Sequence, residues 1–133
     1  MSELRMPFAD LLEMEVLETA PGEVRARMAW REDLCTGAGI LHGGALMAFA
    51  DSVGALCAVL NLPEGHLTST IESKTNFFRA VREGAVEAVA RPLHVGRSTI
   101  VVQTDIRDAE GKRVTQTTQT QAVLSSSRAA GGG

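Results

Sequence analysis

The residues best suited to chemistry in this chain lie between Ile40 and Leu62. This stretch opens with His42-Gly43-Gly44 and continues with small and apolar residues, and Asp51 is its one ionised side chain at neutral pH. A carboxylate on a buried helix is costly unless it is paired or hydrogen-bonded. Asp51 is therefore either a structural carboxylate bonded to a loop or a neighbouring chain, or a catalytic one facing a cleft. The paired glycines favour catalysis, because free backbone N–H groups at a helix start can stabilise a developing oxyanion.

The periodicity of the same stretch predicts one long, buried helix. Bulky residues recur at spacings of three and four, namely Leu46, Phe49, Val53, Leu56 and Leu60. A second stripe is small except for the acid and consists of Gly44, Ala48, Asp51, Ala55 and Ala58. A helix that is apolar nearly all round is buried. We expect it to end near Asn61, before the breaker Pro63-Glu64-Gly65.

The remaining segments predict a sheet that surrounds this helix. A short helix is expected over 7–12, with Phe8, Leu11 and Leu12 facing inward, followed by a hairpin of strands 14–18 and 23–28. After Gly65 the period changes to two, which predicts strands at 67–78, 85–95, 99–107 and 114–124. Pro92 indicates an edge or a bulge, and the Thr- and Gln-rich last strand suits half-exposure. The fold class is therefore α+β, and the free sheet edges predict an oligomer.

Composition limits the classes of partner and compartment. The chain has 133 residues, a formal charge of -3 and 44% hydrophobic residues, which suits a single domain over 1–124 with a disordered low-complexity tail over 125–133. The mild acidity argues against a nucleic-acid-binding protein. The apolar run of the long helix is too short for a membrane span and is interrupted by Asp51. Residues 1–10 lack the apolar region of a signal peptide. Cys35 and Cys57 are isolated and form no metal-ligand spacing with His42, so we expect a cytoplasmic protein without a metal.

Three motifs carry a resemblance to a known family. The runs HGGALMAFADSVGA, FFRAVREG and HVGRS together resemble the hotdog-fold acyl-CoA thioesterases, and within them the phenylacetate-pathway and 4-hydroxybenzoyl-CoA thioesterases. The resemblance covers roughly Leu34 to Leu124. It implies a six-stranded antiparallel sheet wrapped around one central helix. It also implies subunits joined through the strand after that helix, active sites at the interface, and homodimers or homotetramers built from two dimers.

The resemblance also implies roles for individual residues. The backbone N–H of Gly43, helped by Gly44 and the helix dipole, would polarise the thioester carbonyl. Asp51 of the partner subunit would act as nucleophile or as general base, and both alternatives stay open. His42 would orient the substrate or shape the loop, and Thr70 would contact the reacting water. Thr36 occupies a catalytic-loop position where relatives often carry Asn or Gln.

The same resemblance assigns the coenzyme A contacts. Gly96, Arg97 and Ser98 match the turn that meets the pantetheine and the phosphates, and Arg79 is a further candidate for a phosphate. Coenzyme A is part of the substrate here, so no separate cofactor is expected. Glu72 follows Thr70 by two residues, and its two interpretations are a second active-site acid or, by preference, an interface salt bridge.

The expected function is hydrolysis of an aryl- or medium-chain acyl-CoA to the free acid and coenzyme A. One alternative is a non-catalytic acyl-CoA-binding or regulatory module, which tolerates Thr36 but gives no reason for Asp51. A hydratase or dehydratase is a further alternative. It needs a His–acid pair above the acyl β-carbon, whereas His42 precedes the helix.

Overall fold

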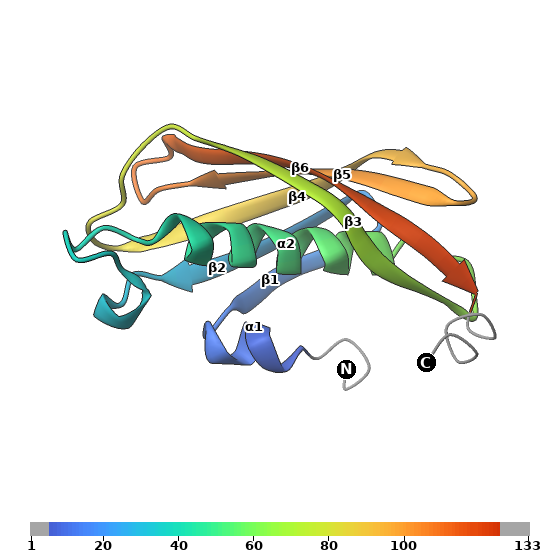
Figure 1. The fold of residues 1–133 in the computed structure, drawn as a ribbon, viewed down its shortest axis with the longest axis horizontal. Helices are drawn as coiled ribbons and strands as arrows, with labels where there is room; N and C mark the ends of the chain where they lie inside the picture. The colour runs from blue at the N-terminus through green and yellow to red at the C-terminus, as the bar shows by residue number, and fades with distance from the viewer. Residues whose placement is uncertain (1–5, 126–133) are drawn as a thin grey trace.

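The computed structural model describes residues 6–125, in which one curved sheet wraps around one long helix (Figure 1). The helices are α1 (Pro7–Leu11) and α2 (Gly43–Val59), with a short 3-10 turn, η2 (Glu32–Leu34), between them. The strands are β1 (Glu15–Ala20), β2 (Glu23–Ala29), β3 (His66–Phe77), β4 (Ala85–Val95), β5 (Thr99–Arg107) and β6 (Arg113–Ser125). They pair antiparallel in the order β1-β2-β4-β5-β6-β3. This confirms the predicted α+β architecture, a six-stranded antiparallel sheet around one helix.

Helix α2 begins at Gly43, because the residues before it are held in an extended conformation. His42 is the N-cap with φ -63° and ψ 137°, and Leu41 forms a β-bridge with Cys35. The bulky stripe is buried against the sheet as predicted, with Phe49 and Val53 fully enclosed. Cys57 is buried in the same core, and its burial raises the pKa of the thiol to about 11. That thiol therefore stays protonated at neutral pH, as befits a small core residue.

The inward face of α1 differs from the prediction. Ala9 and Leu12 are buried, whereas Phe8 is 54% exposed and Leu11 is 66% exposed. Residues three apart share one face of a helix, and in this short helix that face is the pair Ala9 and Leu12. Phe8 and Leu11 are left on the surface beside the start of α2.

The last strand, β6, has one buried face and one partly exposed face, as the prediction of half-exposure required. It lies between β5 and β3 in the sheet rather than at an edge. Its inward residues are fully buried beneath α2, namely Thr115, Thr117, Gln119 and Gln121. A Thr- and Gln-rich sequence thus supplies a buried polar strip, whose side chains need hydrogen-bond partners.

A bulge in β3 changes which of its residues face the helix. The β3–β6 register shifts between Thr70 and Glu72. Thr70 bonds to Asp51 before the shift, whereas Thr75 bonds to the buried Thr117 after it. Because the shift reverses the alternation, Glu72 lies on the face opposite Thr70, although residues two apart in a regular strand share a face. A similar shift between Pro92 and His94 confirms the bulge expected at Pro92.

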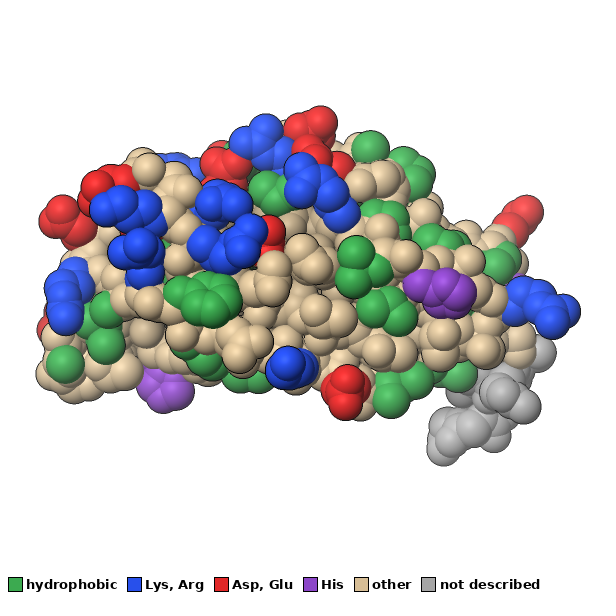
Figure 2. Space-filling view, turned by 90° about the horizontal axis from the view of Figure 1, so that it is seen from above, with side chains coloured by type: hydrophobic (Ala, Val, Ile, Leu, Met, Phe, Trp, Pro, Cys, Tyr) green, Lys and Arg blue, Asp and Glu red, His purple; other side chains and the backbone are tan. Residues whose placement is uncertain are grey.

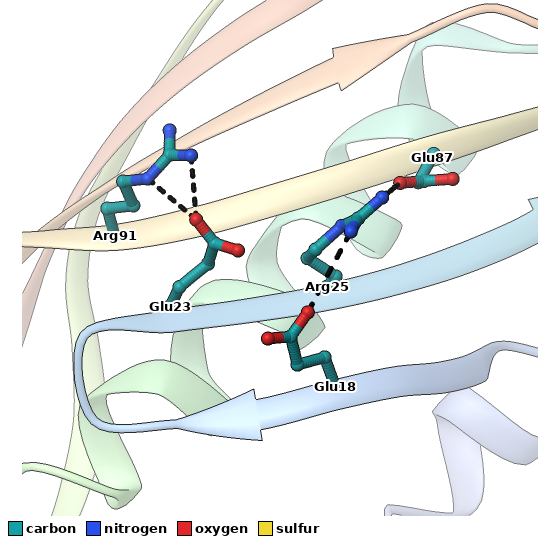
Figure 3. Close-up of polar contacts among 5 residues, drawn as sticks. All are labelled: Glu18, Glu23, Arg25, Glu87 and Arg91. Atoms are coloured by element: carbon teal, nitrogen blue, oxygen red, sulfur yellow. Dashed lines mark hydrogen bonds and ion pairs between the residues drawn. The ribbon is translucent and has the colours of Figure 1, made fainter.

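The outer face of the sheet at β1, β2 and β4 carries a ladder of ion pairs (Figure 3). Arg25 lies between Glu18 and Glu87, and Arg91 pairs with Glu23 at 2.7 Å. The bond from Glu87 raises the pKa of the Arg25 guanidinium above its usual range. Exposed pairs of this kind stabilise little individually, but they make this face polar. Within residues 6–125 no helix is long and apolar enough to cross a membrane.

Candidate active site

The carboxylate of Asp51 is held by two donors from the sheet. Its Oδ1 accepts hydrogen bonds from Thr70 Oγ1 at 2.9 Å and from Gln119 Nε2 at 2.9 Å. Among the residues from 6 to 125, its Oδ2 has no hydrogen-bond partner. The side chain is half-buried. The sheet therefore compensates the charge on one oxygen and leaves the other available for chemistry.

Two buried glutamines extend this polar group, and sequence reasoning missed both. Gln121 Nε2 donates to Thr70 Oγ1 at 2.7 Å, and Thr68 Oγ1 lies 3.0 Å from Gln121 Oε1. Gln119 and Gln121 are fully buried. Their spacing of two residues put them on one face of the strand, and a pair of amides on an inward face would have been the signal. The strand's place in the sheet was needed to show that this face is the inner one.

The start of α2 offers one free backbone donor rather than two. The N–H of Gly44 donates to His42 Nδ1 at 2.7 Å, so the His42 side chain caps the helix. The expectation that the Gly44 amide assists Gly43 was therefore wrong, because that amide is already bonded. In the described part of the chain the Gly43 N–H has no acceptor. Since Nδ1 is an acceptor here, a neutral His42 carries its proton on Nε2.

Gly43 and Asp51 of one chain do not meet. They are eight residues apart on a continuous helix, which separates them by about 12 Å along its axis. An oxyanion donor and an attacking group both act within hydrogen-bond distance of the same reacting centre. The two groups of one chain are therefore too far apart to serve one carbonyl.

A mostly apolar hollow lies beside the start of α2. It has a volume of about 290 Å³, and its lining includes Phe8, Leu11, Leu34, His42 and Ala48. The exposed side chains of α1 thus form one wall, and the small stripe of α2 forms the floor. A larger hollow of about 680 Å³ lies between residues 80–84 and 108–110, and none of the candidate residues lines it. The smaller, apolar hollow is thus the one lined by candidate residues, His42 and Gly44.

The structure does not bring Thr36 to the carboxylate. Its hydroxyl accepts a bond from the Ala38 N–H at 3.2 Å, and its own N–H donates to Ile40 O at 2.8 Å. The N–H is thus used within the loop that precedes α2, whereas the hydroxyl still has its own proton to donate. Glu72 is likewise excluded from the Asp51 group, because the bulge turns it to the other face.

The two candidate phosphate arginines lie at opposite ends of the sheet. Arg97 is in the turn between β4 and β5, where Gly96 N–H donates to Thr99 O at 2.8 Å and Ser98 O accepts from Val123 N–H. Arg79 follows β3 beside the start of β6, where it lines a shallow groove with Phe78, Lys112 and Arg113. Lys and Arg side chains gather at one end of the outer sheet face (Figure 2). One chain therefore presents two separate cationic positions.

Comparisons with known proteins agree with this architecture. The family description that matches residues 38–115 is that of the thioesterase superfamily. A thioesterase of known structure from Haemophilus influenzae superposes with a TM-score of 0.88 at 30% identity, covering 94% of this chain and 87% of that one. A 1,4-dihydroxy-2-naphthoyl-CoA hydrolase of Escherichia coli is 35% identical over 86 residues, covering 65% of this chain and 63% of that protein.

Two further relatives, from Haemophilus influenzae and Vibrio cholerae, are named as esterases and are 42% and 40% identical. The matches cover 56% and 57% of this chain, and the chain spans about half the length of each relative, 54% and 51%. The family match covers more than half of the chain, and the structural match extends over nearly all of it. By sequence and by fold, this chain belongs to the thioesterase superfamily and has the hotdog fold.

Proposed function

We propose that the chain is an acyl-CoA thioesterase whose active sites form between two subunits. The observation that carries the proposal is the half-buried Asp51 carboxylate, fixed through Oδ1 and free at Oδ2. A fixed carboxylate with one free oxygen suits a nucleophile or a general base. A merely acyl-CoA-binding module gives no reason for such a group.

The free edge of β3 supports a partner of the same sequence. β3 ends the sheet on one side, and it is longer than β1 at the other edge. Leu67, Ile71 and Phe77 are 50%, 63% and 48% exposed along it. An uncovered edge strand that exposes apolar side chains favours pairing with another chain. We propose that two β3 strands pair antiparallel about a two-fold axis, giving a dimer or a tetramer of two dimers.

Such a dimer supplies what one chain lacks. The N–H of Gly43 in one subunit polarises the thioester carbonyl, while Asp51 of the other subunit serves the same site. Oδ2 either attacks the carbonyl carbon and expels the thiolate, forming an anhydride that water then hydrolyses, or takes a proton from the attacking water. In both cases the products are a carboxylate and coenzyme A. The Nε2–H of His42 and the hydroxyl of Thr36 orient the substrate from the loop.

The proposed substrates carry an aryl or medium-chain acyl group. The hollow beside α2 has a mainly apolar lining and an aromatic wall at Phe8, and burial of a ring or a short chain there is favourable. The name of the Escherichia coli relative, an aryl-CoA hydrolase, supports the aryl choice. Coenzyme A belongs to the substrate, and the proposal includes no other cofactor.

The two arginines fit one coenzyme A only if they come from different subunits. Antiparallel pairing of β3 puts the Arg79 end of one subunit beside the Arg97 end of the other. Guanidinium groups bind phosphates through paired hydrogen bonds. We propose that Gly96, Arg97 and Ser98 of one subunit and Arg79 of the other bind the pantetheine and its phosphates.

Replacement of either arginine tests this arrangement. Arg97→Ala and Arg79→Ala are each expected to raise KM for acyl-CoA about 5–100-fold, as for loss of a charged hydrogen bond. Neither should raise KM for the matching short pantetheine thioester, which lacks the phosphates. Arg91→Ala is the control, because Arg91 pairs with Glu23 on the outer face. Equal effects of a variant on both substrates would remove that arginine from the phosphate site.

The function itself is tested by coenzyme A release. The wild-type protein is incubated with a panel of aryl-, medium-chain and short-chain acyl-CoA thioesters, and the free thiol is measured with a dye. Saturable turnover that is highest for aryl or medium-chain substrates supports the proposal. Binding without turnover would indicate the non-catalytic module, and hydration of crotonyl-CoA would indicate a hydratase.

A further inference from the structure

We infer that Gln119 is a positioning residue that selects which oxygen of Asp51 reacts, an inference that rests on the proposed thioesterase function. The Gln119 Nε2 lies 2.9 Å from Asp51 Oδ1 and 3.4 Å from the Asp51 carbonyl oxygen. One amide group thus contacts both the side chain and the main chain of the same residue. This double contact restrains the rotation of the carboxylate about its own side-chain bonds.

The hydroxyl of Thr70 can donate its hydrogen bond only to Asp51. Gln121 Nε2 donates to Thr70 Oγ1, so the single hydroxyl proton of Thr70 is left for Asp51 Oδ1. A hydroxyl has one proton to give and two lone pairs to accept with. Oδ1 therefore receives two donors, one from Gln119 and one from Thr70. Its lone pairs are occupied, and Oδ2 is the oxygen left to attack or to take a proton.

Gly54 makes room for the amide of Gln119. A Cβ built on Gly54 would lie 1.9 Å from Gln119 Oε1 and 2.6 Å from its Cδ. Gly54 follows Asp51 by three residues, so both lie on the same side of α2. Only glycine lets the carboxamide of a neighbouring strand approach the helix this closely.

The carbonyl oxygen of the Gln119 side chain indicates that this residue was not selected for stability. Gln119 Oε1 is buried and has no hydrogen-bond partner within residues 6–125. An unpaired buried acceptor costs stability, which a leucine or methionine of similar size would avoid. The reverse orientation would direct this oxygen at the Asp51 carboxylate, and two acceptors with partial or full negative charge repel each other. The amide is thus explained by what its N–H groups do for Asp51.

The test replaces the amide while leaving its volume. Gln119→Leu is expected to lower kcat about 10–100-fold, with KM for acyl-CoA changed less than about twofold, because the loss affects the reacting group and not substrate binding. The melting temperature should be equal or higher, since the orphaned acceptor is removed. Gln116→Leu is the matched control, because Gln116 lies on the same strand but bonds to Asp105 on the outer face. An unchanged kcat in a folded Gln119→Leu oligomer would overturn the inference.

A second variant keeps the test valid if Gln119→Leu folds poorly. Gln119→Glu has the same shape and places a second carboxyl beside Asp51. Two adjacent carboxyl groups resist simultaneous ionisation, so the acid limb of the kcat–pH profile should move upward by about one pH unit or more. A residue 119 that does not contact the Asp51 carboxylate would leave the profile in place, and that result would also overturn the inference.

A readout without turnover separates this inference from the proposed function. The side-chain amide protons of Gln119 and Gln116 are followed by NMR in the wild type and in Asp51→Asn. A shift of the Gln119 resonances alone supports the contact with the carboxylate, even if no acyl-CoA is hydrolysed. Resonances of Gln119 that do not respond to Asp51→Asn would show that the contact is absent in solution, and the inference would fail.

Discussion

Asp51→Asn is expected to lower kcat by about 10²–10⁴-fold, the range typical of a lost general base, with a smaller change in KM. The asparagine oxygen can still accept the bonds from Thr70 and Gln119 that now reach Oδ1. What the substitution removes is the free anionic oxygen, so the fold and the oligomer should persist. The measurement is steady-state coenzyme A release from the best substrate of the panel.

The control for this variant is Asp105→Asn. Asp105 on β5 is also a carboxylate that accepts hydrogen bonds from neighbouring side chains, those of Gln116 and Arg113. Unlike Asp51, it lies on the outer face of the sheet. The same chemical change there should leave kcat unaltered. Near wild-type turnover by a folded Asp51→Asn protein would show that the Asp51 carboxylate is structural. Glu72 would not replace it, because the bulge in β3 directs that side chain away from the site.

Separation of the subunits is expected to abolish activity as strongly as loss of the carboxylate. The double variant Leu67→Lys with Ile71→Lys puts two charges on the exposed edge of β3, a device by which natural edge strands avoid pairing. Both side chains are at least half exposed in the single chain, so the subunit should still fold. Without the partner, Gly43 and Asp51 cannot act on one carbonyl. Light scattering should show a monomer whose kcat is lower by about 10² or more.

The opposite edge of the sheet provides the control. Val16→Lys changes an apolar residue of β1 that is 43% exposed, and it should leave the oligomer and its activity intact. A stable monomer of the β3 variant that retains wild-type turnover would contradict the two-subunit site. It would mean that each chain completes its own active site.

Local patterns were sufficient for much of this fold. The alternation and the flanking glycine turns predicted β4 and β5 with the bounds that the structure has, 85–95 and 99–107. Spacing alone also predicted two features of the site. His42 immediately precedes the helix, and Asp51 lies on the stripe of small residues. These features depend on residues that are neighbours in sequence.

The features that sequence reasoning missed depend on distant pairings. Gln119 meets Asp51 only because β6 lies inside the sheet next to β3, a contact between residues 68 positions apart. The composition of β6 did not show which of its Thr and Gln side chains face the helix, and no local signal gave its place in the strand order. The bulge after Thr70 similarly comes from pairing with β6, and it puts Glu72 on the face opposite Thr70. The short α1 turned Phe8 and Leu11 outward because only one of its faces contacts the core.

The central claim is that each active site takes Gly43 from one subunit and Asp51 from the other, and subunit mixing tests it most directly. Gly43→Pro removes the amide donor at a position that suits proline, because it is the first helical residue and the extended His42 suits the residue before it. The added Cβ would lie 3.2 Å from the ring of Phe77, which is 48% exposed and can shift. Gly43→Pro and Asp51→Asn are each nearly inactive alone. When they are unfolded together in equal amounts and refolded, half of the dimers are mixed, and each mixed dimer has one intact site. We predict recovery of about a quarter of the wild-type activity, whereas a mixture as inactive as its parents would contradict the shared site.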